Sequence, residues 1–137
     1  MFNPIYSRTK AGSTPSMPWY KAIVNSTTST TRFLMDNYAG VEFRVVGQEE
    51  KDGVIFRISE FLKDGKVIVH STVEMPVARN PPEFIEEMRR RVIPIGDAIR
   101  MNGYSVEYRI TDHDTVFKEY EMVGDVYLRI KELYYEM

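Results

Sequence analysis

The stretch KDGVIFRISEFLKDG, residues 51–65, places one apolar strand between two Asp-Gly pairs. An Asp-Gly pair suits the left-handed backbone angles of a two-residue hairpin turn. Residues 41–48 before it alternate between apolar and polar side chains, and residues 66–75 after it form a further run that ends at Pro76. The stretch therefore predicts three antiparallel strands joined by tight turns, with residues 54–62 as a central strand that is apolar on both faces.

Outside this stretch the chain predicts three helices and a second set of strands. Hydroxyl residues before residues 32–39, and Gly40 after them, are start and stop signals of a helix. Residues 81–91 begin with proline and acids and end with cations, which matches a helix dipole, and a shorter helix follows from Pro94. Three strands close the chain, at 104–111, 116–122 and 126–135. The last of these also has apolar residues at helical spacing, but the short turn before it favours a strand. The prediction is an α+β fold in which helices pack on one face of a six-stranded antiparallel sheet.

Length and composition indicate one globular domain, predicted to span residues 19–137 behind a flexible N-terminal tail, residues 1–18, with several Pro, Ser and Thr. A formal net charge of -2 argues against nucleic acid as a partner. No apolar run is long enough to cross a membrane, and no charged and then apolar leader opens the chain. With no cysteine and two histidines, neither a thiolate nucleophile nor a metal centre is expected. His113 between two aspartates is interpreted as a turn, and the expected compartment is the cytoplasm.

Two charged side chains occupy positions where their strands are otherwise apolar. Glu132 shares one face of the last strand with Leu128, Ile130 and Tyr134, and Arg57 lies in mid-strand between apolar neighbours. Burying a charge without a partner costs several kcal/mol, so each of these residues requires an oppositely charged or hydrogen-bonding partner. Two interpretations stay open. The two charges pair with each other across the core, or the guanidinium binds a carboxylate of a small ligand whose polar group meets the glutamate.

Four short motifs together resemble a known family. They are Ile55-Phe56-Arg57-Ile58, the interval from Gly65 to Pro76, Pro94-Ile95-Gly96 and Lys131-Glu132-Leu133. Their order and spacing resemble the chorismate lyase family, in particular its archaeal branch, from about Thr27 to the C-terminus. The segment Ser29-Thr30-Thr31-Arg32-Phe33-Leu34 also resembles the family's segment before its first strand. The resemblance implies a chorismate lyase-like fold.

The resemblance further implies an enzyme that converts chorismate to 4-hydroxybenzoate and pyruvate without a cofactor. Its ligand is then a small aromatic carboxylic acid, held in a pocket that is poor in water. Arg57 matches the family's arginine that grips the ring carboxylate. Glu132 matches its glutamate near the ring hydroxyl, suited to hydrogen bonding or proton transfer. The main chain at Ile95 and Gly96 matches a helix start that contacts the ligand.

The chain departs from the family at one position. The bacterial enzyme has a second arginine for the enolpyruvyl carboxylate, and a count without gaps places Thr72 there, next to Ser71. Hydroxyls hydrogen-bond a carboxylate but do not neutralise it. Either Arg79 or Arg32 substitutes for the missing cation, or the ligand has one carboxylate. Two alternatives to the enzyme therefore stay open: a non-catalytic domain that binds an aromatic acid in the same pocket, and a structural domain with an internal salt bridge between its two buried charges.

Overall fold

A computed structural model describes residues 17–137, so most of the predicted N-terminal tail lies outside the described residues. The described chain forms one six-stranded sheet in the order β1-β2-β3-β6-β5-β4, in which all neighbours are antiparallel. The predicted α+β class and antiparallel sheet are confirmed. The strands are β1 (Val41–Lys51), β2 (Val54–Lys63), β3 (Lys66–Pro76), β4 (Val106–His113), β5 (Phe117–Gly124) and β6 (Tyr127–Tyr134).

The two Asp-Gly pairs form the turns that the sequence predicts. Asp52 and Gly53 join β1 to β2 with φ angles of 53° and 77°, and Asp64 and Gly65 join β2 to β3 with 53° and 79°. Aspartate tolerates this left-handed region better than most residues, and glycine enters it without steric penalty. The first half of the sheet is therefore built from two tight local hairpins.

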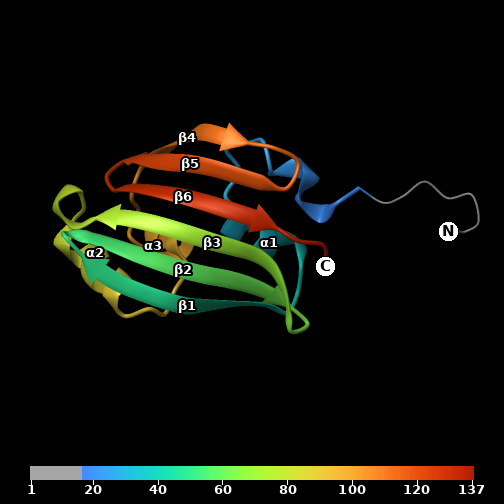
Figure 1. Ribbon diagram of the computed structural model, residues 1–137, viewed down its shortest axis with the longest axis horizontal. Coiled ribbons are helices and arrows are strands. Elements are labelled where there is room, and N and C mark those ends of the chain that lie inside the picture. Colours follow the sequence, from blue (N-terminus) through green and yellow to red (C-terminus); the bar gives the residue numbers. More distant parts are fainter. Residues whose placement is uncertain (1–16) are drawn as a thin grey trace, which may run out of the picture.

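Three α-helices and two short 3-10 helices complete the fold of residues 17–137. All three α-helices were predicted, with ends that differ by one or two residues at most positions. The 3-10 helices were not, because three or four residues are too few to show a helical period. Figure 1 shows the helices behind the sheet, on one of its faces. The elements are η1 (Trp19–Ala22), α1 (Thr30–Asn37), η2 (Val77–Arg79), α2 (Pro82–Arg89) and α3 (Ile95–Met101).

The covered face of the sheet carries two separate apolar clusters. In the first, Ile55, Val73 and Ile130 pack with buried residues of α2 and α3. In the second, Phe61 and Tyr134 pack with buried residues of η1 and α1. Each cluster holds its own helices against the sheet by burying apolar surface. The positions between the two clusters are occupied by polar side chains, and these form the site described below.

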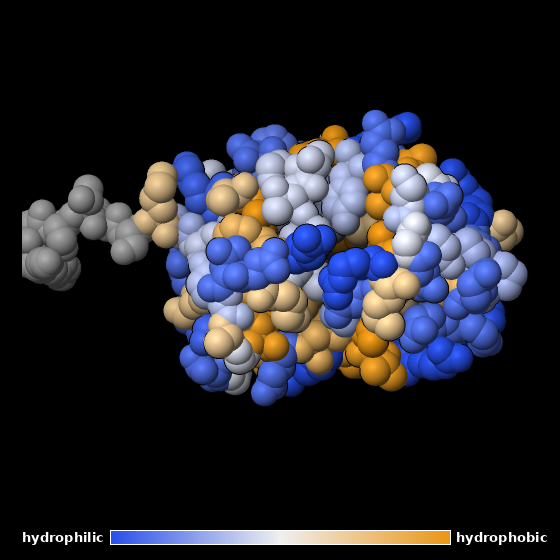
Figure 2. Space-filling view, turned by 180° about the vertical axis from the view of Figure 1, so that it is seen from behind, coloured by the Kyte–Doolittle hydropathy of each residue, from blue (hydrophilic) through white to orange (hydrophobic). Residues whose placement is uncertain are grey.

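The other face of the sheet carries no helix of the described chain (Figure 1). Phe56 and Ile58 point to this open face and are 41% and 40% exposed. β2 is apolar on both faces, as the sequence shows, but from Ile55 to Phe61 its buried side chains lie on one face only. Figure 2 shows the opposite side of the molecule, on which the helices lie; this surface is mainly hydrophilic with hydrophobic residues scattered between. Within residues 17–137, no helix combines the length and the apolar character that crossing a membrane requires.

Candidate functional site

A row of polar side chains crosses the covered face between the two apolar clusters. Ser59, Ser71, Glu132 and Lys118 are successive partners across β2, β3, β6 and β5. Directly paired residues point to the same face of a sheet, and all four are buried. The sheet register therefore places two charges and two hydroxyls side by side in the interior.

Glu132 is the centre of this row and is 5% exposed. Its Oε1 accepts hydrogen bonds from Thr30 Oγ1 and Tyr134 OH, both at 2.7 Å. Its Oε2 accepts one from Tyr120 OH at 3.2 Å. A carboxylate has about four acceptor positions, so Oε2 keeps room for one further donor. The buried acid is thus stabilised by three hydroxyl groups and keeps one acceptor position on Oε2.

The hydroxyl of Thr30 reaches the site because α1 begins there. Ser29 is the N-cap of α1, and its side chain accepts a hydrogen bond from the Arg32 backbone amide at 3.3 Å. Capping by serine fixes the first turn, and Thr30 and Thr31 of that turn are buried against the sheet. The run of hydroxyl residues before the apolar part of α1 therefore serves both as a helix start and as a source of donors.

Glu132 lines a cavity between the sheet and the starts of α1 and α3. The cavity volume is about 30 Å³, which is room for one or two water molecules. One wall is the sheet, and the other is formed by the two helix starts. The lining residues are Ser29, Thr30, Thr31, Phe43, Ser59, Phe61, Ser71, Val73, Pro94, Ile95, Gly96, Tyr120, Met122, Ile130 and Glu132.

The helix wall is closed by a tight contact between α1 and α3. A Cβ atom built on Gly96 would lie 2.9 Å from both Cβ and Oγ1 of Thr31 and 3.5 Å from Oγ of Ser29. The first two distances are shorter than normal van der Waals contacts, so only glycine allows this approach. Gly96 is therefore the point at which the two helix starts meet over the cavity.

Two tyrosines at the site have strongly raised pKa values. Burial and the nearby charge of Glu132 raise the pKa of Tyr120 well above its usual value, and the same two causes raise the pKa of Tyr134. The ring of Tyr120 also stacks on that of Tyr108, with centroids 5.5 Å apart and planes 8° from parallel. Both phenols are therefore neutral hydrogen-bond donors at physiological pH.

Arg57 is buried as predicted, at 1% exposure, but it does not pair with Glu132. Its Nε donates to Gln48 Oε1 at 2.9 Å, and Nη1 and Nη2 donate to the carbonyls of Ile93 and Met88 at 3.0 Å. These acceptors are neutral: one is a side-chain oxygen of β1, and the two carbonyls lie in the last turn of α2 and in the segment that leads to α3. Burial, with a smaller effect from the like charge of Arg91, lowers the pKa of Arg57 to about 10. The guanidinium thus braces the helices and forms no ion pair within residues 17–137.

Of the predicted ligand-binding residues, four line the cavity and two do not. Ser71, Ile95, Gly96 and Glu132 are in its walls. Arg57 lies outside the lining, two residues along β2 from the lining residue Ser59. Thr72 lies on the open face, because neighbouring residues of a strand point to opposite faces.

The two arginines that were considered as substitutes for a second cation are also absent from the cavity lining. Arg79 lies over the ring of Tyr127, with its guanidinium carbon 3.6 Å from the centroid. Arg32 is exposed and pairs with Asp36. No lysine or arginine is among the lining residues of the cavity.

Sequence reasoning missed Lys118, a third buried charge, which is 1% exposed. Its Nζ donates to the backbone carbonyls of Ile23 and Ser26 at 2.9 Å and of Thr28 at 3.3 Å. The alternation of β5 contains the signal: Lys118 shares its face with Tyr120 and Met122, both of them buried. A lysine on the apolar face of a strand is as unusual as the glutamate on β6.

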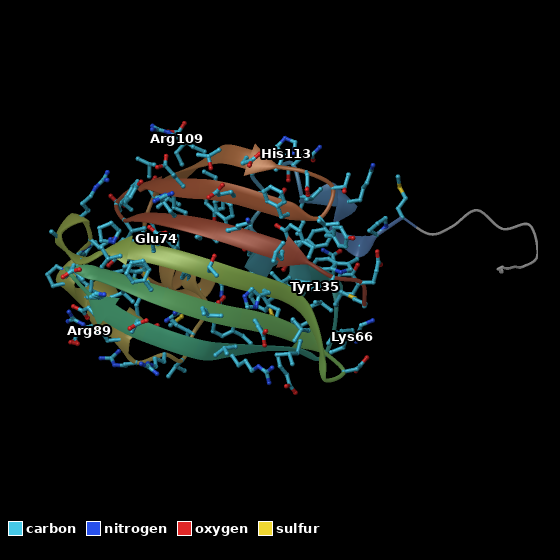
Figure 3. The ribbon with its side chains drawn as sticks, viewed as in Figure 1. Lys66, Glu74, Arg89, Arg109, His113 and Tyr135 are labelled. Atoms are coloured by element: carbon cyan, nitrogen blue, oxygen red, sulfur yellow. The ribbon has the colours of Figure 1, made fainter. Side chains whose placement is uncertain are left out.

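Other charged side chains lie outside the site. Figure 3 shows Glu74 on the open face and Arg109 and His113 along the edge strand β4. The aspartates around His113 cap the turn: Asp114 accepts hydrogen bonds from the Val116 and Phe117 amides at 2.8 and 3.0 Å. Among residues 17–137, no group of three His, Asp or Glu side chains is placed to hold a metal ion.

Comparison with known proteins adds no family to this geometry: no protein-family model matches the chain, and no curated protein matches it. The functional argument therefore depends on the residues of the site.

Proposed function

We propose that this chain is a chorismate lyase-like enzyme, which eliminates pyruvate from chorismate and leaves 4-hydroxybenzoate. The observation that carries the proposal is Glu132, a buried carboxylate that lines a cavity opposite a helix start and keeps an acceptor position on Oε2. A sheet with helices on one face agrees with the fold that is expected from the resemblance of this chain to the family. The motif positions at Ser71, Ile95 and Gly96 line the same cavity, which gives the resemblance a spatial basis.

The reaction needs proton transfers and no redox partner. The ring carbon that bears the hydroxyl loses its proton, and the ether bond to the enolpyruvyl group breaks with its electron pair on oxygen. The released enolpyruvate takes up a proton and becomes pyruvate, while the ring becomes aromatic. In the proposal the ring hydroxyl donates a hydrogen bond to the free acceptor position of Glu132 Oε2. A carboxylate held by Thr30, Tyr120 and Tyr134 is fixed in place for this task, which lowers the barrier by orientation.

Binding of a ring requires the helix wall to move. A cavity of about 30 Å³ is smaller than an aromatic acid needs, because small-molecule sites usually have several hundred Å³. The sheet wall is fixed by its ladders of hydrogen bonds, whereas the helix wall consists of the ends of two short helices that meet at Gly96. In the proposal, α1 moves away from α3 to admit the ligand and returns to exclude water.

Arg57 supplies the positive charge for the ring carboxylate. A guanidinium has five N–H donors, and three are in use here. The remaining two belong to Nη1 and Nη2. Within the described chain, the Arg57 guanidinium contacts only neutral oxygens. The carboxylate of a bound ligand would therefore be its first anionic partner.

The direct test is incubation of the purified full chain with chorismate while 4-hydroxybenzoate and pyruvate are measured. Equal amounts of the two products are expected. Glu132→Gln keeps the size of the side chain and should lower kcat by about 100-fold or more. Glu74→Gln is the matched control, since Glu74 lies on the open face and pairs there with Arg129; its kcat should be unchanged. If Glu132→Gln retains full turnover, the role given to Glu132 is wrong.

A non-catalytic domain that binds an aromatic acid is the second candidate. It is favoured by one observation, that the cavity lining contains no lysine or arginine for a second carboxylate. Under this candidate chorismate gives no product, but 4-hydroxybenzoate stabilises the fold by about 2.7 kcal/mol at a hundred times its Kd. Absence of both product and stabilisation would support a purely structural domain.

A further inference from the structure

We propose that Lys118 is a positioning residue of the Glu132 site: its ammonium group holds the segment that runs from Ile23 to Thr28, and this fixes the Thr30 hydroxyl against Glu132. The inference deepens the proposed function and rests on it in one respect, that Glu132 acts on the ligand. The contacts that support it are independent of any ligand.

The ammonium group uses its whole hydrogen-bonding capacity on one segment of chain. It has three N–H donors, and its three acceptors are the carbonyls of Ile23, Ser26 and Thr28. These residues form the irregular connection between η1 and α1. A neutral side chain of similar length, such as glutamine, has two donors and would leave a carbonyl unpaired. Lys118 is therefore suited to hold this connection in one conformation.

The clamped connection leads directly to the site. Thr28 precedes the N-cap Ser29, and the next residue, Thr30, donates to Glu132 at 2.7 Å. Lys118 and Glu132 are direct partners in the β5–β6 ladder. Lys118 therefore contacts the connection, the connection leads to Thr30, and Thr30 binds Glu132. Glu132 in turn lies beside Lys118 in the sheet. A displacement of the connection by one ångström would break the bond to Glu132.

The charge of Lys118 also suits this position. Its Nζ lies 5.1 Å from the ring centroid of Tyr120, whose hydroxyl donates to Glu132. Burial lowers the pKa of Lys118, and the negative charge of Glu132 offsets part of that shift. A cation and a carboxylate in the same water-poor interior lower the free energy of both buried charges.

The test uses the full chain and a double-mutant cycle. Lys118→Met removes the charge and the donors but keeps the stem, and Thr30→Val removes the hydroxyl but keeps the shape. Lys66→Met is the control, since Lys66 is an exposed lysine at the hairpin end of β3 (Figure 3). Two kinds of measurement are made where all variants are fully folded: hydrogen exchange of the Val24, Ser26 and Thr28 amides, and steady-state kinetics with chorismate, which give kcat and KM.

With Lys118→Met, exchange in the connection should become at least tenfold faster while the β3–β6 ladder is unchanged. The value of kcat should fall at least tenfold, with KM within twofold, because Glu132 and not the carboxylate site is disturbed. Adding Thr30→Val should then have no further effect on kcat, since both changes remove the same contact. The control should behave as wild type. If Lys118→Met does not fold, Lys118→Arg replaces it, and the same faster exchange is expected because a planar guanidinium does not match three converging carbonyls.

The outcomes separate the two proposals. A wild type that neither turns over chorismate nor binds 4-hydroxybenzoate contradicts the proposed function, while the exchange rates still test the clamp. Additive effects of Lys118→Met and Thr30→Val on kcat, or unchanged exchange in the connection, would overturn the role of Lys118 even in an active enzyme.

Discussion

Arg57 brings a full positive charge to the covered face of the sheet, and each partner that it finds there is a neutral oxygen. The carbonyl of Met88 lies in the last turn of α2, where a cation is favourable, and it also accepts a hydrogen bond from the Arg91 amide at 3.1 Å. The carbonyl of Ile93 lies just before α3. The side chain therefore has a structural task whether or not it also binds a ligand.

Replacing Arg57 with methionine should lower the free energy of unfolding by about 2–4 kcal/mol, because Gln48 Oε1 and the Ile93 carbonyl lose this donor, whereas the Met88 carbonyl keeps Gln48 Nε2 and the Arg91 amide. Urea unfolding measures the change. Arg44→Met is the control: Arg44 lies on the exposed side of β1 and pairs with Glu60, and loss of such a surface pair should change stability by less than about 1 kcal/mol. A neutral or stabilising effect of Arg57→Met would show that the residue is retained for its ligand alone.

The tyrosines that bind Glu132 predict a loss of stability in alkali. Their folded-state pKa values lie above the ordinary value of 10.0, so the unfolded chain gives up these protons first. The stabilisation is fully present below pH 10 and is lost as the pH rises above it, by up to about 1.4 kcal/mol per pH unit for each tyrosine. Urea unfolding between pH 8 and 11 tests this: Tyr134→Phe should flatten the decline. Parallel profiles for the variant and the wild type would contradict the assignment.

At the scale of elements, the site depends on the approach of α1 to α3. The helices are short, and their contact at Gly96 and Thr31 is the place where the cavity wall closes. Alanine is normally the better helix former by about 1 kcal/mol. Here the added Cβ would meet Thr31 at 2.9 Å, and steric overlap outweighs propensity.

Gly96→Ala should therefore destabilise the protein by about 1–3 kcal/mol, the usual range for overpacking. Thermal unfolding measures it. Gly47→Ala is the matched control, since a Cβ at Gly47 has no heavy atom within 4 Å, and its effect should be small. An equal response of the two variants would mean that α1 yields freely to the methyl group.

Elements and sites differ in how far the sequence predicts them. The Asp-Gly turns, the strand alternation and the buried positions of Arg57 and Glu132 follow from local pattern, and the structure confirms them. The partners of Glu132 do not follow from it, because Thr30 is 102 residues away along the chain. Such contacts depend on the order of strands and the docking of helices. The burial of Lys118 could have been predicted from the alternation of β5, whereas its three carbonyl partners could not.

At the scale of the whole molecule, the sheet consists of two halves with different connections. Strands β1 to β3 follow one another through hairpins, and so do β4 to β6. The halves are joined by the β3–β6 ladder, which pairs residues from Val69 with Tyr134 to Glu74 with Arg129. Ser71 and Glu132 are opposite each other in this ladder, so the cavity spans the junction.

This junction has a consequence for folding kinetics. Local hairpins close short loops, whereas the β3–β6 pairing has to close a loop that contains α2, α3 and two strands, at a greater cost in chain entropy. Each half should therefore gain protection first, and the junction last. Pulse-labelled hydrogen exchange during refolding should show protected β1–β2 amides before those of Lys131 and Leu133, which face β3 across the junction; simultaneous protection would contradict this order. Glu132 then meets Tyr120 and Tyr134 within its own half of the sheet but faces Ser71 only in the final step, so no half-folded chain can present the complete site.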